Sequence, residues 1–220
     1  MSSEAFTGDK KVDQSWLIRT ENNVVARTIH YLPSWLETYH LTLMTIVWSM
    51  GVVISGYLAR QNLSWLWLSS LMIFMQYVTD LYDGKVGKHR NTGLIKWGYF
   101  MDHFLDYIFL CSILTGYFFL IPLQYHLYLF AIMAFSGAFM VNSYLSFAAT
   151  NRFKIEFLTV GPTQVRFGFI VFNTLIICFG TPLLIKSLPF FLVTSFVVLC
   201  LVVYRTQKYI WKMDMENKKK

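Results

Sequence analysis

The feature that most constrains this chain is a series of apolar stretches that fill nearly all of it. A membrane-spanning helix needs about 20 predominantly apolar residues, and 55% of the 220 residues are hydrophobic while only 14% are charged. Six such stretches are present, at 41–59, 63–82, 99–120, 125–149, 166–185 and 188–207. The sequence therefore predicts an all-α, polytopic membrane protein with six transmembrane helices and no soluble domain of useful size.

The segments that flank these stretches are polar. Residues 14–32 place apolar side chains at helical spacing among Arg19, Glu21 and Arg27, which predicts an N-terminal amphipathic helix beside the membrane. The leader has no short apolar core with a cleavage site, so we expect no removable signal peptide. We divide the chain into a cytoplasmic leader with this interfacial helix (1–40), a six-helix transmembrane domain (41–207) and a basic cytoplasmic tail (208–220).

The net charge of +7 is unevenly distributed. Almost all Lys and Arg residues lie in the leader, in the segments 83–98 and 150–166, and in the tail. Under the positive-inside rule these segments face the cytoplasm, and an even number of spans returns the C-terminus to the side of the N-terminus. The tail suits anionic lipid headgroups, and no motif supports nucleic-acid binding. The three cysteines have neither disulfide nor zinc spacing, so we interpret them as packing residues.

Four aspartates are the only acidic residues between positions 41 and 150: Asp80, Asp83, Asp102 and Asp106. A carboxylate inside a membrane is costly and is normally kept where it pairs, conducts or catalyses. The first two are three residues apart at the end of the second apolar stretch, and the last two are four apart at the start of the third. Each pair therefore lies on one helix face, and we expect all four side chains to converge at the cytoplasmic membrane boundary.

Converging carboxylates repel one another unless cations neutralise them. Oxygen ligands without nearby histidine or thiol pairs favour Mg²⁺, Mn²⁺ or Ca²⁺ over zinc or copper. We expect a loop between the two pairs, because the segment is rich in helix breakers. This segment supplies glycines that let backbone approach a diphosphate and cations that neutralise it: Gly84, Gly87 and Gly93, and Lys85, Lys88 and Arg90.

The two aspartate pairs and their surroundings resemble the signature of the CDP-alcohol phosphotransferase family, also called CDP-alcohol phosphatidyltransferases. The signature is D-x2-D-G-x2-A-R, a spacer of about eight residues, and G-x3-D-x3-D; here the segments read DLYDGKVGK from Asp80 and GYFMDHFLD from Gly98. Six of its eight fixed positions match. Gly87 replaces the family's alanine and, like it, is small enough to let cytidine lie close, whereas Lys88 replaces an arginine and gives up its bidentate contact.

The resemblance implies an enzyme of phospholipid biosynthesis with a six-span fold, and a homodimer. A second alcohol would attack the β-phosphorus of a metal-bound CDP-alcohol and release CMP. By the same likeness Asp80, Asp83 and Asp102 are the main ligands of Mg²⁺ or Mn²⁺, and Asp106 shares ligation or takes the proton of the incoming hydroxyl as general base. The implied nucleotide and diphosphate site comprises Asp80, Gly84, Gly87, Lys88 and Thr42.

Further residues have both a functional and a structural interpretation. His103 follows Asp102 as a histidine does in the choline and ethanolamine branch of the family, but adjacent helix residues point about 100° apart. Arg166, in a Gly–Pro–Thr run typical of that branch, and Arg152 are candidates for binding a substrate phosphate, although the positive-inside rule also explains them. Thr42 either lies near the nucleotide or caps a helix.

Two substrate pairings stay open. Within the family that the chain resembles, a short six-span chain is typical of members that use CDP-diacylglycerol with a small polar alcohol. Asp102–His103 and the Gly–Pro–Thr run resemble members that use CDP-choline or CDP-ethanolamine with a diglyceride. An alternative function is an aspartate-based divalent-cation or proton-coupled transporter, which predicts mid-membrane carboxylates or broken helices in two repeated halves. A third is an intramembrane prenyltransferase, which needs a longer bundle and differently spaced aspartates.

Overall fold

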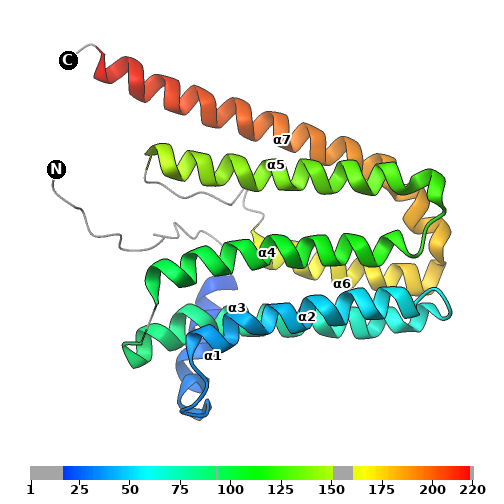
Figure 1. Cartoon of the computed structure of the whole chain (residues 1–220), viewed down its shortest axis with the longest axis horizontal. Coiled ribbons are helices and arrows are strands. Elements are labelled where there is room, and N and C mark those ends of the chain that lie inside the picture. The colour runs from blue at the N-terminus through cyan, green and yellow to red at the C-terminus, as the bar shows by residue number, and fades with distance from the viewer. Residues whose placement is uncertain (1–16, 93, 151–160, 219–220) are drawn as a thin grey trace.

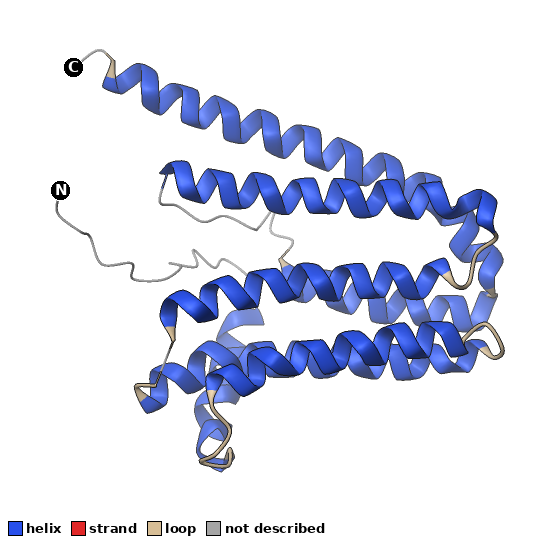
Figure 2. Cartoon of the chain, in the orientation of Figure 1, coloured by secondary structure: helices blue, strands red, loops and turns tan. Residues whose placement is uncertain are grey.

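The computed structural model describes residues 17–92, 94–150 and 161–218, and these residues form helices joined by short connections (Figures 1 and 2). No strand occurs within these ranges, so the all-α prediction is confirmed. Three single-turn 3₁₀ helices, η1 (Ile29–Tyr31), η2 (Leu63–Trp65) and η3 (Leu123–Tyr125), lie in the connections. The α-helices are α1 (Leu17–Thr28), α2 (Thr38–Leu58), α3 (Leu66–Arg90), α4 (Ile95–Phe118), α5 (His126–Thr150), α6 (Pro162–Phe179) and α7 (Thr181–Asn217).

Four helical segments are long and apolar enough to cross a membrane: Thr38–Leu58, Leu123–Thr150, Pro162–Phe179 and Thr181–Glu216. Helices α3 and α4 contain 25 and 24 residues, which is also sufficient length. They carry the four aspartates, however, and α3 ends in three basic residues. The expected span is therefore supported for α2, α5, α6 and α7 and stays a prediction for α3 and α4.

The long helices run side by side, with α2 packed against both α3 and α4 and with α6 packed against α3 (Figure 1). Helices α5 and α7 pack mainly on each other. The buried apolar core joins α2, α3, α4, α5, α6 and the start of α7, and includes Val52, Ile73, Phe109, Leu129, Ile176 and Leu184. This packing holds the polar halves of α3, α4 and α6 close together, where the aspartates lie.

Helix α1 lies within the segment predicted to be amphipathic and is tied to α3 by two side-chain hydrogen bonds. The Tyr77 hydroxyl donates to Glu21 Oε1 at 2.9 Å, and the hydroxyls of Thr28 and Tyr82 lie 2.5 Å apart. Its place on the membrane surface stays a prediction. The contacts fix α1 beside the half of α3 that carries the aspartates.

The prediction of a loop over residues 83–98 is wrong for most of that range, because these residues lie mainly in helices α3 and α4. Helix α3 continues to Arg90 and ends at Asn91, which takes the left-handed conformation with φ 54°. The two glycines inside this last part of the helix cost about 1 kcal/mol each relative to alanine. Val86 is fully buried in a small apolar cluster with residues of α1, η1 and α2. Tertiary packing therefore outweighs the weak helix propensity of this segment.

The boundary between the last two predicted spans also lies elsewhere. It was expected near residue 186, but α6 ends at Phe179 and α7 starts at Thr181. Gly180 between them has φ 81°, which favours glycine. Pro182 fits the first turn of α7, where a missing N–H costs nothing. Helix α7 then continues to Asn217, so most of the basic tail extends this helix.

Helices α2 and α4 approach each other closely at two glycines. A Cβ added at Gly56 would lie 2.4 Å from the Cα of Gly116, which is backbone and cannot rotate away. Gly56→Ala should therefore force the two helices apart, at a cost of about 1–3 kcal/mol, and should lower the melting temperature in detergent. Gly168→Ala is the control, because its added Cβ meets nothing within 4 Å. Equal melting temperatures for the two variants would contradict the close approach.

Candidate functional site

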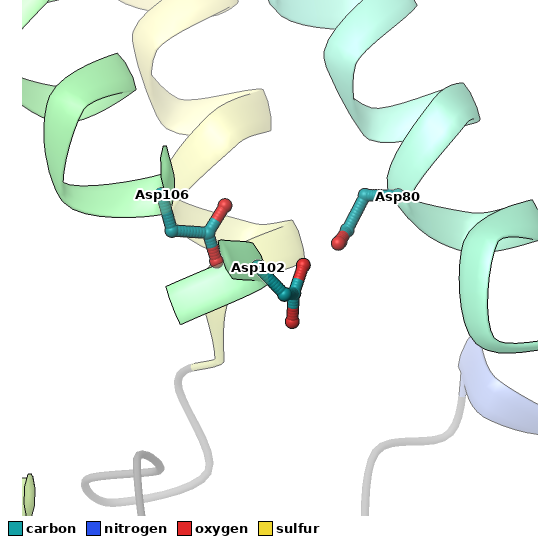
Figure 3. A group of neighbouring side chains, drawn as sticks. All are labelled: Asp80, Asp102 and Asp106. Carbon is teal, nitrogen blue, oxygen red and sulfur yellow. The ribbon is translucent and has the colours of Figure 1, made fainter. Parts of the chain in front are cut away.

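Three of the four predicted aspartates lie together in one site (Figure 3). Asp80 comes from α3, and Asp102 and Asp106 come from successive turns of α4. Each offers one carboxylate oxygen, and these oxygens all lie within 4.8 Å of one another. All three residues are partly exposed. We call these residues the aspartate triad; it brings three negative groups within reach of one small cation.

Asp83 lies outside the triad, so the expected convergence holds for three aspartates only. Its buried side chain accepts a hydrogen bond from Thr42 Oγ1 on Oδ2 at 2.6 Å, and its backbone carbonyl accepts one from Thr38 Oγ1 at 3.2 Å. These two donors come from the first turns of α2. Thr42 does not cap that helix, because its N-cap residue is Glu37. Packing against α2 thus gives Asp83 and Thr42 a direct contact that helix spacing alone does not predict.

One cation in contact with the triad is Arg166 of α6. Its Nη1 lies 2.7 Å from Asp80 Oδ2 and its Nη2 lies 2.9 Å from Asp106 Oδ1, and only 8% of the side chain is exposed. Gly161 and Pro162 begin α6 just before this residue, with proline in the first turn. The guanidinium therefore ties α3, α4 and α6 together through two charge-assisted hydrogen bonds.

One residue of the site, Gln76, was missed by the sequence analysis. Its Nε2 donates to Asp106 Oδ1 at 3.1 Å, and its side chain is 1% exposed. It lies four residues before Asp80 on α3 and therefore on the same helix face. The available signal was an amide inside an otherwise apolar stretch, since polar residues in membrane helices usually form contacts between helices.

His103 lies beside Asp102, and its role in the site stays a prediction. It is buried, its Nδ1 is hydrogen-bonded to the Tyr99 carbonyl oxygen at 2.7 Å, and the same nitrogen lies 3.8 Å from Asp102 Oδ2. Its ring contacts Tyr99 and Tyr144, with centroids 4.4 Å and 6.0 Å apart. The histidine therefore packs between α4 and α5.

Three of the residues predicted for a diphosphate, Gly84, Gly87 and Lys88, lie along the last two turns of α3, and Gly93 lies outside the described residues. Gly84 is exposed with open space where a Cβ would be, Gly87 is buried and Lys88 is exposed. Arg90 is engaged elsewhere, since its guanidinium donates to the backbone carbonyls of four residues between 32 and 36. It fastens the α1–α2 connection to the end of α3. Arg152 lies outside the described residues.

The donor set of the triad suits a hard divalent cation. Three carboxylate oxygens within one small space are ligands that Mg²⁺ and Mn²⁺ prefer. When all three are ionised, the single positive charge of Arg166 leaves an excess of negative charge in this group. The described residues therefore fit Mg²⁺ or Mn²⁺ on Asp80, Asp102 and Asp106.

Comparison with protein families gives one match that bears on this site. The model of the family described as CDP-alcohol phosphatidyltransferase matches residues 32–204, which is most of the chain. The matched range includes the aspartate triad, Gln76, Asp83 and Arg166. Neither the curated proteins nor the solved structures give a match.

Proposed function

The chain belongs to the CDP-alcohol phosphatidyltransferase family, and from this premise we propose that it transfers a substituted phosphate from a CDP-alcohol to a second alcohol with release of CMP. The observation that carries the proposal is the aspartate triad, whose members occupy family signature positions and present oxygens within 4.8 Å of one another. Membership supports an integral membrane transferase of phospholipid synthesis.

We assign Asp80, Asp102 and Asp106 to Mg²⁺ or Mn²⁺. When bound, this ion offsets charge on the diphosphate and on the leaving CMP. Asp83, which the resemblance also makes a ligand, is held by Thr42 about one helical turn from Asp80. We place this pair on the nucleotide side of the site, together with the exposed backbone at Gly84 and the residues Gly87 and Lys88.

Asp106 is our candidate for the general base. Its Oδ1 accepts hydrogen bonds from both Arg166 and Gln76, so the carboxylate is held in one orientation. A positioned carboxylate can take the proton of an attacking hydroxyl as the new bond to phosphorus forms. Arg166, already beside two members of the triad, is our candidate contact for a substrate phosphate.

The topology we propose has six spans, with α3 and α4 crossing the membrane beside α2 and α6. The basic residues at the end of α3 and in the C-terminal part of α7 then face the cytoplasm, and so does the triad. By family likeness we propose a homodimer. The transporter alternative predicts mid-membrane carboxylates or broken helices in two repeated halves. Helices α3 and α4 are continuous through the aspartates, which speaks against its second form.

The test is CMP formation by the purified full-length protein in lipid–detergent micelles. We expect CMP from one pairing, either CDP-diacylglycerol with a small polar alcohol or CDP-choline or CDP-ethanolamine with a diglyceride. Removal of divalent metal with a chelator should abolish the reaction, and Mn²⁺ or Mg²⁺ should restore it, because three carboxylates without a bound metal ion repel the negative charge of a diphosphate. Failure of every pairing to release CMP would refute the proposal.

A further inference from the structure

Gln76 is a buried residue that contacts Asp106, the proposed general base. The residue is 1% exposed, and its amide Nε2 reaches from α3 to Asp106 Oδ1 on α4 at 3.1 Å. Asp106 Oδ1 also accepts from Arg166. These two donors differ in charge. The charged guanidinium partly neutralises the carboxylate, whereas the neutral amide orients it and leaves its charge intact.

The carbonyl oxygen of the same Gln76 side chain lowers the stability of the fold. Gln76 Oε1 is buried and has no hydrogen-bond partner among the residues that the structure describes. Most buried polar atoms in native proteins have a partner, and a buried acceptor without one destabilises the fold. Ile73, which lies one helical turn before Gln76 on α3, is apolar and fully buried. An apolar side chain of the same length would therefore suit this position better, unless the amide serves another purpose.

We propose that Gln76 is a positioning residue for phosphotransfer, which holds the Asp106 carboxylate in the orientation that accepts the proton of the incoming alcohol. The inference rests on the proposed function, since it needs Asp106 to act as the base. It extends the site beyond the family signature, because Gln76 lies before the first signature aspartate. A small displacement of a reacting group is enough to reduce turnover strongly.

The test compares Gln76→Met with Ser49→Ala. Methionine keeps the length of the side chain and removes both the donor and the buried acceptor. Ser49 is the matched control, because its Oγ on α2 is likewise buried without a partner in the described part of the chain, and we place it outside the site. Each variant is measured for melting temperature, Mn²⁺ affinity, KM for the CDP-alcohol and kcat.

We expect Gln76→Met to lower kcat by about tenfold or more while KM and Mn²⁺ affinity stay close to their original values and the melting temperature is unchanged or higher. Ser49→Ala should show the same thermal effect with an unchanged kcat. Retained kcat in Gln76→Met overturns the proposal, and so does a parallel loss of kcat and melting temperature, which indicates a purely structural role.

A second measurement covers the case in which Gln76→Met fails to fold, and it separates this proposal from the proposed function. The melting temperatures of Gln76→Leu, Asp106→Ala and the double variant form a cycle that reports coupling between the two side chains, because each single variant removes the hydrogen bond between them. Non-additive changes in melting temperature, together with a lower kcat in Gln76→Leu, support the proposal. Additive changes overturn the role of Gln76 and leave the proposed function standing. An unaltered protein that releases no CMP overturns the proposed function and this inference with it.

Discussion

Asp106→Asn is expected to reduce CMP formation by about 10²–10⁴-fold, the range that general-base groups contribute. Asparagine is nearly the same size and can still accept from the amide of Gln76 and the guanidinium of Arg166, so the helices should keep their arrangement. It cannot take a proton from the acceptor hydroxyl. The rate of CMP release at saturating CDP-alcohol is the measurement, because a loss confined to the chemical step appears in kcat.

The same variant separates the two roles that the sequence leaves open for Asp106. If it acts mainly as the base, Mn²⁺ affinity should fall only slightly while turnover is lost. If it is mainly a ligand, Mn²⁺ affinity and turnover should fall together, as they should for Asp80→Asn. Glu216→Gln is the control, since this exposed acid on α7 forms an ion pair with Lys212, one turn earlier on the same helix. Turnover close to that of the unaltered protein would remove Asp106 from the mechanism.

The sequence predicted the helical fold and the grouping of three of the four aspartates, because both depend largely on short-range patterns. Apolar stretches of membrane-spanning length became long helices, and aspartates four residues apart on α4 became neighbours on one face. Asp83 shows the limit of this reasoning. Its direction depends on Thr42, 41 residues earlier in the chain, and therefore on how α2 packs against α3.

Contacts between distant parts of the chain explain the other differences. Arg166 reaches Asp80 across 86 residues, and Gln76 reaches Asp106 across 30, so neither pairing follows from spacing within a motif. The extension of α3 through its glycines has the same cause, because Val86 is buried by α1, η1 and α2 together. The position of the break at Gly180 did have a local signal, in the pair of glycine and nearby proline.

Arg166→Gln should produce the second large effect, a gain in metal affinity together with a loss of stability in metal-free protein. The guanidinium lies within 3 Å of oxygens on Asp80 and Asp106, which are also the proposed ligands of Mn²⁺. Two unit charges 4 Å apart interact by about 4 kcal/mol at an effective dielectric constant of about 20. Even a third of that value corresponds to about a tenfold change in affinity.

The expected result is therefore Mn²⁺ binding tighter by about tenfold or more, measured by equilibrium dialysis, and a lower melting temperature in chelator that Mn²⁺ largely restores. Removing one partner of a buried ion pair costs about 3–5 kcal/mol, and an added cation can replace the lost charge. Arg60→Gln is the matched control, because this arginine lies before α3 begins and packs over Tyr57. Unchanged or weaker Mn²⁺ binding in Arg166→Gln would mean that arginine and metal do not share these carboxylates, and the cation site would then have to be sought nearer Asp83.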